Sequence, residues 1–177
     1  MGNDCKVINI SQRKVNIIGI DQHTMNDIKI CTAAAVIETQ HGPTIAIFNQ
    51  GAYHGRGHSI ISPAQLEHFG IRVEDKSRRA GGAQCLITPD GYVIPLAIKN
   101  GLAYFTMRPP TDAEWNRLPH VIMTSDEEWD LRALDYDPVL QDEDWVETLR
   151  QHTVDSPHIH KFCDKGDYRD IHLPRVG

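Results

Sequence analysis

The sequence predicts a mainly β protein with short helices. Three stretches have the alternation or the β-branched enrichment of strands, at Lys14–Ile20, Ile28–Thr39 and Thr44–Asn49. The pair Asn100-Gly101 is the strongest two-residue hairpin turn in the chain, because both residues tolerate a positive φ. Strands joined by tight turns therefore set the fold class.

The first strands are expected to form a hairpin. The apolar stretch Ile28–Thr39 reads as a strand, with a helix over Ala33–Glu38 as the alternative because of its three alanines. His41-Gly42-Pro43 is a turn signal, so Ile30–Thr39 and Thr44–Asn49 are expected to pair.

A bent loop and a short helix are predicted next. The glycines that break the strand pattern are Gly51, Gly55 and Gly57. Ser62 is expected to cap the helix, with Pro63 at its first position and Gln65 reaching back to the cap. The residues expected to face the core or to end the helix are Leu66, Phe69 and Gly70.

A second β unit begins at Ala83, after a polar stretch, Arg72–Gly82, that predicts a mobile loop. The strands expected in this unit are Cys85–Thr88, Tyr92–Ile98, Leu102–Met107 and His120–Thr124. Thr111-Asp112-Ala113-Glu114 is a capping box, which predicts a helix to about Leu118, and Pro119 ends it.

The C-terminal part is predicted to be an acidic tail. Ten acidic residues lie between Asp126 and Glu147 against the single base Arg132, which argues against direct nucleic-acid binding there. Asp142–Gln151 fits one amphipathic helix, and Thr153–Gly177 is expected to be a linker.

Composition places the chain inside the cell, in the cytoplasm. No apolar run approaches the roughly 18 residues of a membrane-spanning helix, and no secretory signal is visible at the N-terminus. The four cysteines are scattered without a Cys-x-x-Cys pair, as expected of reduced thiols. No membrane partner is expected.

The order of strand, glycine loop, two-isoleucine step and short helix resembles the C-terminal half of a retropepsin, the aspartic protease of retroviruses and retrotransposons. Ile60-Ile61-Ser62-Pro63-Ala64-Gln65-Leu66 is similar to the Leu-Leu-Ser-x-x-Gln-Leu pattern of copia-type proteins. Lys14–Ile20 looks like the flap strand. The resemblance implies a substrate-binding flap made by Ile17, Ile18, Gly19 and Ile20.

Later strings also resemble copia-like LTR-retrotransposon polyproteins, in the region between protease and integrase. They are Thr88–Leu96, Met107–Trp115 and Leu118–Asp126. The resemblance implies three regions: a truncated, incomplete retropepsin-like β-barrel at 1–72, a small β-rich hairpin module at 83–124, and an acidic, partly disordered tail or linker at 125–177.

No catalytic residue is predicted. Aspartic proteases need Asp-Thr-Gly or Asp-Ser-Gly, and the chain has neither; Asp164-Lys165-Gly166 lacks the hydroxyl residue. By the resemblance, Met1 falls a few residues after the place of that motif. The expected function is therefore that of a retrotransposon-derived remnant of a polyprotein-processing protease, inactive as this chain stands. Its implied partners are peptide or polyprotein segments, with a homodimer as the family's assembly.

Two alternatives remain open at this point. The chain can instead be a non-catalytic module for self-association or protein interaction, acting through its β edges or its acidic tail. A zinc site is the weaker alternative, because the spacing of His158, His160, Cys163 and His172 is not that of an integrase zinc module. No metal and no cofactor is predicted.

Overall fold

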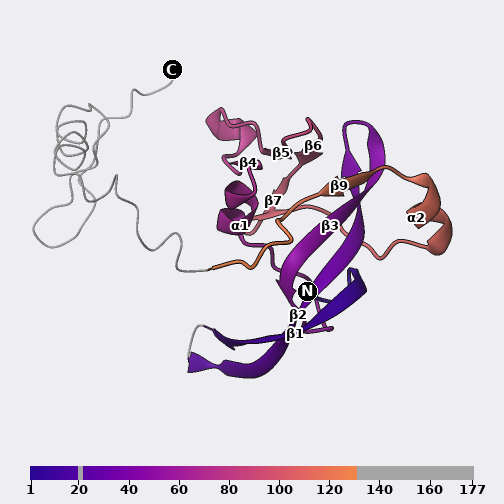
Figure 1. The fold of residues 1–177 in the computed structure, drawn as a ribbon. Helices are drawn as coiled ribbons and strands as arrows, with labels where there is room; N and C mark the ends of the chain where they lie inside the picture. Colours follow the sequence, from indigo (N-terminus) through magenta and orange to yellow (C-terminus); the bar gives the residue numbers. More distant parts are fainter. Residues whose placement is uncertain (20–21, 131–177) are drawn as a thin grey trace, which may run out of the picture. The chain divides into compact units, whose positions relative to one another are not determined.

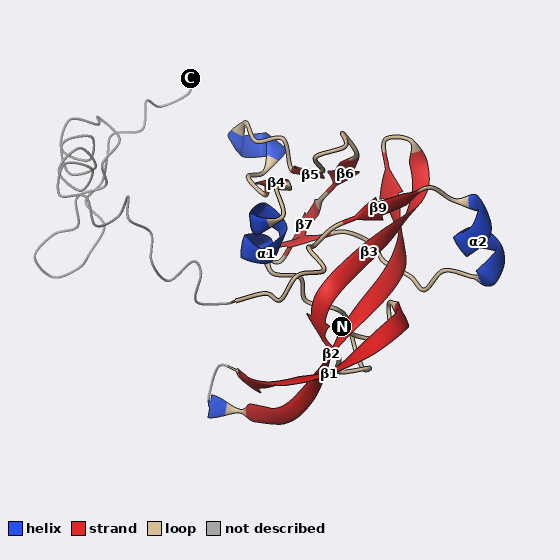
Figure 2. Cartoon of the chain, in the orientation of Figure 1, coloured by secondary structure: helices blue, strands red, loops and turns tan. Residues whose placement is uncertain are grey.

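The computed structural model describes residues 1–19 and 22–130, which belong to one compact unit, Met1–Asp130. The predictions for the tail beyond Asp130 lie outside these residues, as does Ile20. The described part is mainly β, which confirms the predicted fold class (Figures 1 and 2).

The described strands form open sheets rather than a closed barrel. The largest sheet has the order β1-β2-β3-β9, with bounds β1 Lys6–Ile18, β2 Thr24–Thr39, β3 Gly42–Ala52 and β9 His120–Ile122. The second sheet is β4 Arg72–Glu74, β5 Cys85–Ile87 and β6 Val93–Pro95. The third is the hairpin of β7 Ala97–Lys99 and β8 Leu102–Tyr104.

The predicted hairpin of β2 and β3 is confirmed, and the helical alternative over Ala33–Glu38 is wrong. The turn lies one residue earlier than expected, because Pro43 is already opposite Glu38 in the ladder. Alanine suits these positions because Ala33, Ala34 and Ala35 are fully buried, and small side chains let layers pack closely on both faces of the strand.

Two apolar clusters cover the two faces of this hairpin. On one face, Ala33, Ala35 and Phe48 pack with Leu66 of α1 (Pro63–His68) and with side chains of β5 and β6. The other face holds a smaller cluster of Ala34, Val36 and Ile45, which Trp115 and Leu118 cover from α2 (Asp112–Arg117) and its C-cap. The main sheet is therefore a buried middle layer at this point.

The predicted regions 1–72 and 83–124 share their sheets in the structure. β9 pairs in parallel with β3, through Ile45↔His120 to Ile47↔Ile122. β4 joins β5 in antiparallel register. Gln40, in the β2–β3 turn, exchanges hydrogen bonds with Val93 of β6. Residues of both regions thus build one core.

The helix signals are confirmed in position. Ser62 caps α1 by accepting from the Gln65 N–H, Pro63 is at its start, and Gly70 follows the helix with φ +89°. The expected contact of the Gln65 side chain with the cap is not formed, since only the Gln65 backbone N–H bonds to Ser62. The side-chain amide donates to the Asn49 carbonyl at 3.4 Å. Thr111 and Glu114 form the predicted capping box of α2.

Two expectations for the middle of the chain need correction. Arg72–Gly82 is not one loop, because Arg72–Glu74 pairs with β5 as β4 and Arg78–Ala80 makes a 3₁₀ turn. The single strand predicted over Tyr92–Ile98 is divided at Leu96, whose backbone N–H donates to the Gln84 carbonyl, so β6 and β7 belong to different sheets. The Asn100-Gly101 turn has the positive φ values predicted for it, 52° and 76°.

Candidate functional site

The far half of the β1–β2 hairpin is the part of the fold on which the flap prediction falls. β3 pairs with β2 only as far as Ile30, and one further backbone bond joins the Tyr53 N–H to the Lys29 carbonyl. Apart from that bond, within the described residues, Lys14–Ile18 and Thr24–Lys29 pair only with each other. We call these two segments the ribbon; Figure 1 shows it continuing past β3.

Ile17, Ile18 and Gly19 lie at the outer end of the ribbon. Ile17 is opposite Met25 and Ile18 is opposite Thr24, while the Gly19 N–H donates to the His23 carbonyl at 2.8 Å. Ile18 is 74% exposed and Ile17 is half-buried. The structure therefore brings these three residues together near the hairpin tip, and their role as a flap stays a prediction.

One face of the ribbon is apolar. Val15 is opposite Ile28 and Ile17 is opposite Met25, and all four side chains are half-buried. None of them belongs to the two core clusters of the described residues. This face can therefore bury more apolar surface against a ligand or a partner.

A β-bulge creates that face. Met25 and Ile28 are three residues apart, so regular alternation would place them on opposite faces. The ladder shifts register between Val15 and Ile17, Asp27 takes a φ of +57°, and its N–H donates to the Asn16 side chain at 3.0 Å. The extra residue returns both side chains to one face.

Sequence reasoning found half of this surface. The alternation of Lys14–Ile20 indicates that Val15 and Ile17 share a face, whereas Met25 and Ile28 require knowledge of the bulge. An aspartate three residues into a strand, as Asp27 is in β2, does not identify a bulge from sequence, because aspartate is common in ordinary turns as well.

A polar cluster joins the start of the chain to the glycine loop after β3. The Asp4 carboxylate accepts from the Ser59 N–H at 2.8 Å and from the Ser59 hydroxyl at 2.6 Å. The Asn3 N–H donates to the Gly57 carbonyl at 2.9 Å. Burial would raise the pKa of Asp4, but the hydrogen bonds from Ser59 outweigh it and lower that pKa below its ordinary value.

This cluster holds the fold together and is not arranged for nucleophilic catalysis. Burial raises the pKa of the Cys5 thiol to about 11, so the reactive thiolate is scarce at neutral pH. The His58 ring lies 3.7 Å from Asp4 and is exposed, and no contact joins it to the Ser59 hydroxyl. The group on the hydroxyl is the Asp4 carboxylate, whose lowered pKa makes it a weak base, and no described histidine contacts the hydroxyl to activate it for acyl transfer.

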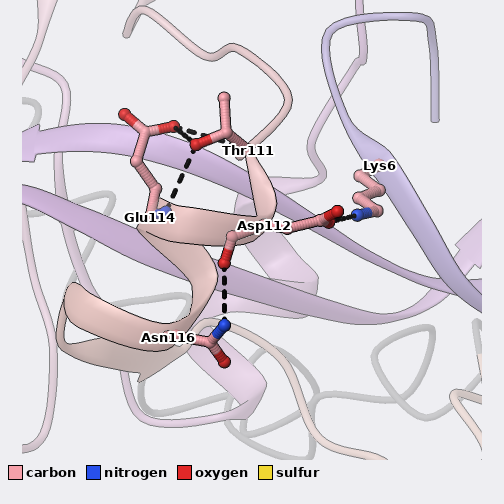
Figure 3. A network of polar contacts seen from close by, with 5 residues as sticks. All are labelled: Lys6, Thr111, Asp112, Glu114 and Asn116. Carbon is pink, nitrogen blue, oxygen red and sulfur yellow. Dashed lines mark hydrogen bonds and ion pairs between the residues drawn. The ribbon is translucent and has the colours of Figure 1, made fainter.

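Another polar network fixes α2 to the main sheet (Figure 3). Lys6 of β1 pairs with Asp112 at 2.7 Å, and the Asn116 amide donates to the Asp112 carbonyl at 3.0 Å. Arg108 donates two hydrogen bonds to Glu114, which lower the pKa of Glu114 to about 2. The side chains of Lys6, Asp112 and Arg108 are exposed, so these contacts hold α2 in place and do not enclose a ligand site.

One small hollow among the described residues lies between α1 and the segment that follows β9. It is about 30 Å³ and is lined by Gln65, His68, Ser125, Glu127, Glu128 and Trp129. That volume suits about one water molecule and not a substrate. Within residues 1–19 and 22–130 no group of three metal-ligating side chains gathers, and the predicted tail cluster around His158 lies outside them.

Neither described helix has the length and the hydropathy to cross a bilayer. Comparison of the chain with protein-family models, with curated proteins and with solved structures found no match. The ribbon, with its apolar face, is therefore the candidate functional site that the geometry of the chain itself supports.

Proposed function

We propose that this chain is a retrotransposon-derived segment of retropepsin type that binds extended peptide without cleaving it. Its ribbon acts as the flap over that peptide. The apolar face made by Val15, Ile17, Met25 and Ile28 is the observation that carries the proposal. The absence of Asp-Thr-Gly and Asp-Ser-Gly from the sequence supports binding without catalysis.

The ribbon has the two properties that strand-like peptide recognition needs. β1 is an edge strand of the main sheet, so the backbone groups on its outer side can bond to an added strand. The half-buried apolar side chains can take up alternate side chains of that strand. Backbone bonds then give affinity, and side-chain contacts give selectivity.

Self-association through the same strand is the second candidate. β1 carries Ile8 and Ile10, which are 45% and 41% exposed, beside its open edge. Two copies pairing through antiparallel β1 edges would bury these side chains with closed twofold symmetry. This candidate needs no peptide ligand.

One set of measurements separates the two candidates. A fluorescein-labelled ten-residue peptide rich in valine and threonine is titrated with the full chain, and fluorescence anisotropy reports binding. Sedimentation velocity of the unlabelled chain reports its mass. Peptide binding by a monomer supports the role of the ribbon as a flap, whereas a dimer that does not bind the peptide supports self-association.

The double variant Ile17→Ser/Met25→Ser tests the ribbon directly. It is expected to weaken peptide binding roughly tenfold or more, since two apolar contacts are lost. The matched control is Ile60→Ser, because Ile60 is 93% exposed and lies outside the ribbon. Equal binding by the two variants contradicts the proposal.

An internally quenched peptide library tests the lack of catalysis. No cleavage above buffer is expected; cleavage that an aspartic-protease inhibitor blocks would overturn this part of the proposal. The proposal also assigns the chain to the cytoplasm. The described cysteines, Cys5, Cys31 and Cys85, are free thiols, which agrees with a reducing compartment.

A further inference from the structure

A cationic stretch stands out in a chain of net charge −6. Residues 76–107 hold four bases, Lys76, Arg78, Arg79 and Lys99, against the single acid Asp90, so their net charge is +3. None of the four bases forms an ion pair within the described residues, whereas Lys6, Arg13, Lys14, Arg72 and Arg108 do. Their charge is thus available to a ligand.

The loop that carries three of these bases is held in shape. The Ser77 hydroxyl caps the 3₁₀ turn by accepting from the Ala80 N–H, and the Ser77 carbonyl accepts from the Gly82 N–H at 2.9 Å. A side chain at Gly82 would meet the Lys76 carbonyl oxygen at 2.0 Å, so only glycine fits. Ordering of the loop lowers the entropic cost of binding through it.

The same loop adjoins the hairpin of β7 and β8. The Gln84 side chain accepts from the Arg78 N–H at 3.1 Å and donates to the Leu96 carbonyl at 2.6 Å. Leu96 directly precedes β7. Gln84 therefore joins the cationic loop to the start of the β7–β8 hairpin.

The β7–β8 hairpin exposes apolar side chains next to Lys99, its basic residue. Lys99 is opposite Leu102 and Ala97 is opposite Tyr104, which places Lys99, Leu102 and Tyr104 on one face. Leu102 is 62% exposed and Tyr104 is 46% exposed. Lys99 is exposed as well, so this face of the hairpin is accessible within the described part of the chain.

We propose that this cationic hairpin surface, made of Lys76, Arg78, Arg79, Lys99, Leu102 and Tyr104, docks an acidic peptide with interspersed apolar residues. Carboxylates would pair with the unpaired bases, and apolar side chains would pack on Leu102 and Tyr104. This surface is separate from the ribbon and does not depend on the flap proposal.

An acidic peptide fits this surface better than a nucleic acid does. Four bases and one exposed tyrosine make a small footprint, and nucleic-acid affinity grows with the number of phosphates contacted and bases stacked. A short peptide with a few carboxylates needs only local complementarity.

The probe is a fluorescein-labelled dodecapeptide of three Glu-Leu-Asp-Trp repeats, titrated with the full chain at low and at physiological salt. Two double variants remove one component each: Arg78→Ser/Arg79→Ser and Leu102→Ser/Tyr104→Ser. The control, Arg56→Ser/Arg117→Ser, removes the same charge at exposed residues elsewhere. Circular dichroism verifies that each variant is folded.

Each surface variant is expected to weaken binding roughly fivefold or more, and the control less than about twofold. A control peptide with serine in place of leucine and tryptophan is expected to bind as weakly as the apolar variant does. No binding of the probe overturns the proposal, as does equal weakening by the control variant. Tighter binding of a twelve-nucleotide oligothymidine would reassign the surface to single-stranded nucleic acid.

Discussion

The two halves of the β1–β2 hairpin share one ladder and differ in what surrounds them. In the near half, Ala33 and Ala34 of β2 lie between β1 and β3, and Ala35 to Ile37 continue the pairing with β3. All five are buried on both faces, each at most 2% exposed. In the ribbon, the same strand has one neighbour and alternates between half-buried and exposed side chains. Strand pairing alone therefore does not make a core; a third strand and two covered faces do.

The contrast follows from side-chain size and neighbours rather than from strand propensity. Alanine is a weak strand former, yet Ala33–Ala35 occupy the best-packed part of the sheet. The ribbon contains stronger strand formers, such as Val15, Ile17 and Ile28, but its apolar face belongs to neither core cluster of the described residues. Stability is expected to be concentrated in the near half, and capacity for binding in the ribbon.

The largest expected effect is in the near half. Phe48, 1% exposed, is opposite Ala33 and fills the main core, so Phe48→Ala is expected to lower the free energy of unfolding by about 3–5 kcal/mol. Urea denaturation measures it. The ribbon control is Ile18→Ala, expected to stay within about 0.5 kcal/mol of the parent protein. Similar losses of unfolding free energy for the two variants would contradict the difference in stability between the near half and the ribbon.

Glycine replacement gives the next largest effect. A Cβ atom at Gly2 would lie 2.1 Å from the Gly57 carbonyl oxygen, which is backbone and cannot move freely, so Gly2→Ala is expected to cost about 1–3 kcal/mol. At Gly19, by the ribbon tip, the nearest atom is 3.6 Å away, and Gly19→Ala is expected to be nearly neutral. Thermal unfolding of the pair decides this; a Gly2→Ala protein as stable as its parent contradicts the described contact.

Acid sensitivity is expected at Asp4. Its folded-state pKa lies below the ordinary 3.8, so the stabilisation is present above pH 3.8 and is lost as the pH falls through the folded-state pKa. Asp4→Asn is expected to lower stability at pH 7 by about 1 kcal/mol and to flatten the pH dependence in that acidic window. Asp27→Asn in the ribbon removes an equally charged but exposed carboxylate and is expected to change neither quantity measurably.

The smallest expected effect concerns the ribbon itself. Ile17→Ala is expected to cost no more than about 1 kcal/mol, because the side chain is only half-buried. In hydrogen exchange, the ribbon amides of Thr24–Ile28 are expected to exchange faster than those of Ala33–Ile37. Equal protection of both segments would show that the ribbon is as cooperative as the core.

Local patterns predicted most elements of the fold. The strand cores, the Asn100-Gly101 turn and the capping box of Thr111 and Glu114 each depend on residues close in sequence. The first half of β1 was missed because Lys6–Arg13 mixes polar residues with its isoleucines, and only its pairing with β2 makes it a strand. For the candidate site, alternation predicted the β1 side of the ribbon and not the β2 side.

The sequence by itself determined the mainly β class, the turns and the helix ends, because backbone preference, capping and alternation act over a few residues. Only the tertiary structure decided that β9 pairs in parallel with β3, that Asp4 holds Ser59, and that a bulge at Asp27 gives the ribbon an apolar face. Such pairings join residues far apart in the chain or depend on ladder register. They are selected by the burial that the whole fold achieves, which no short stretch records.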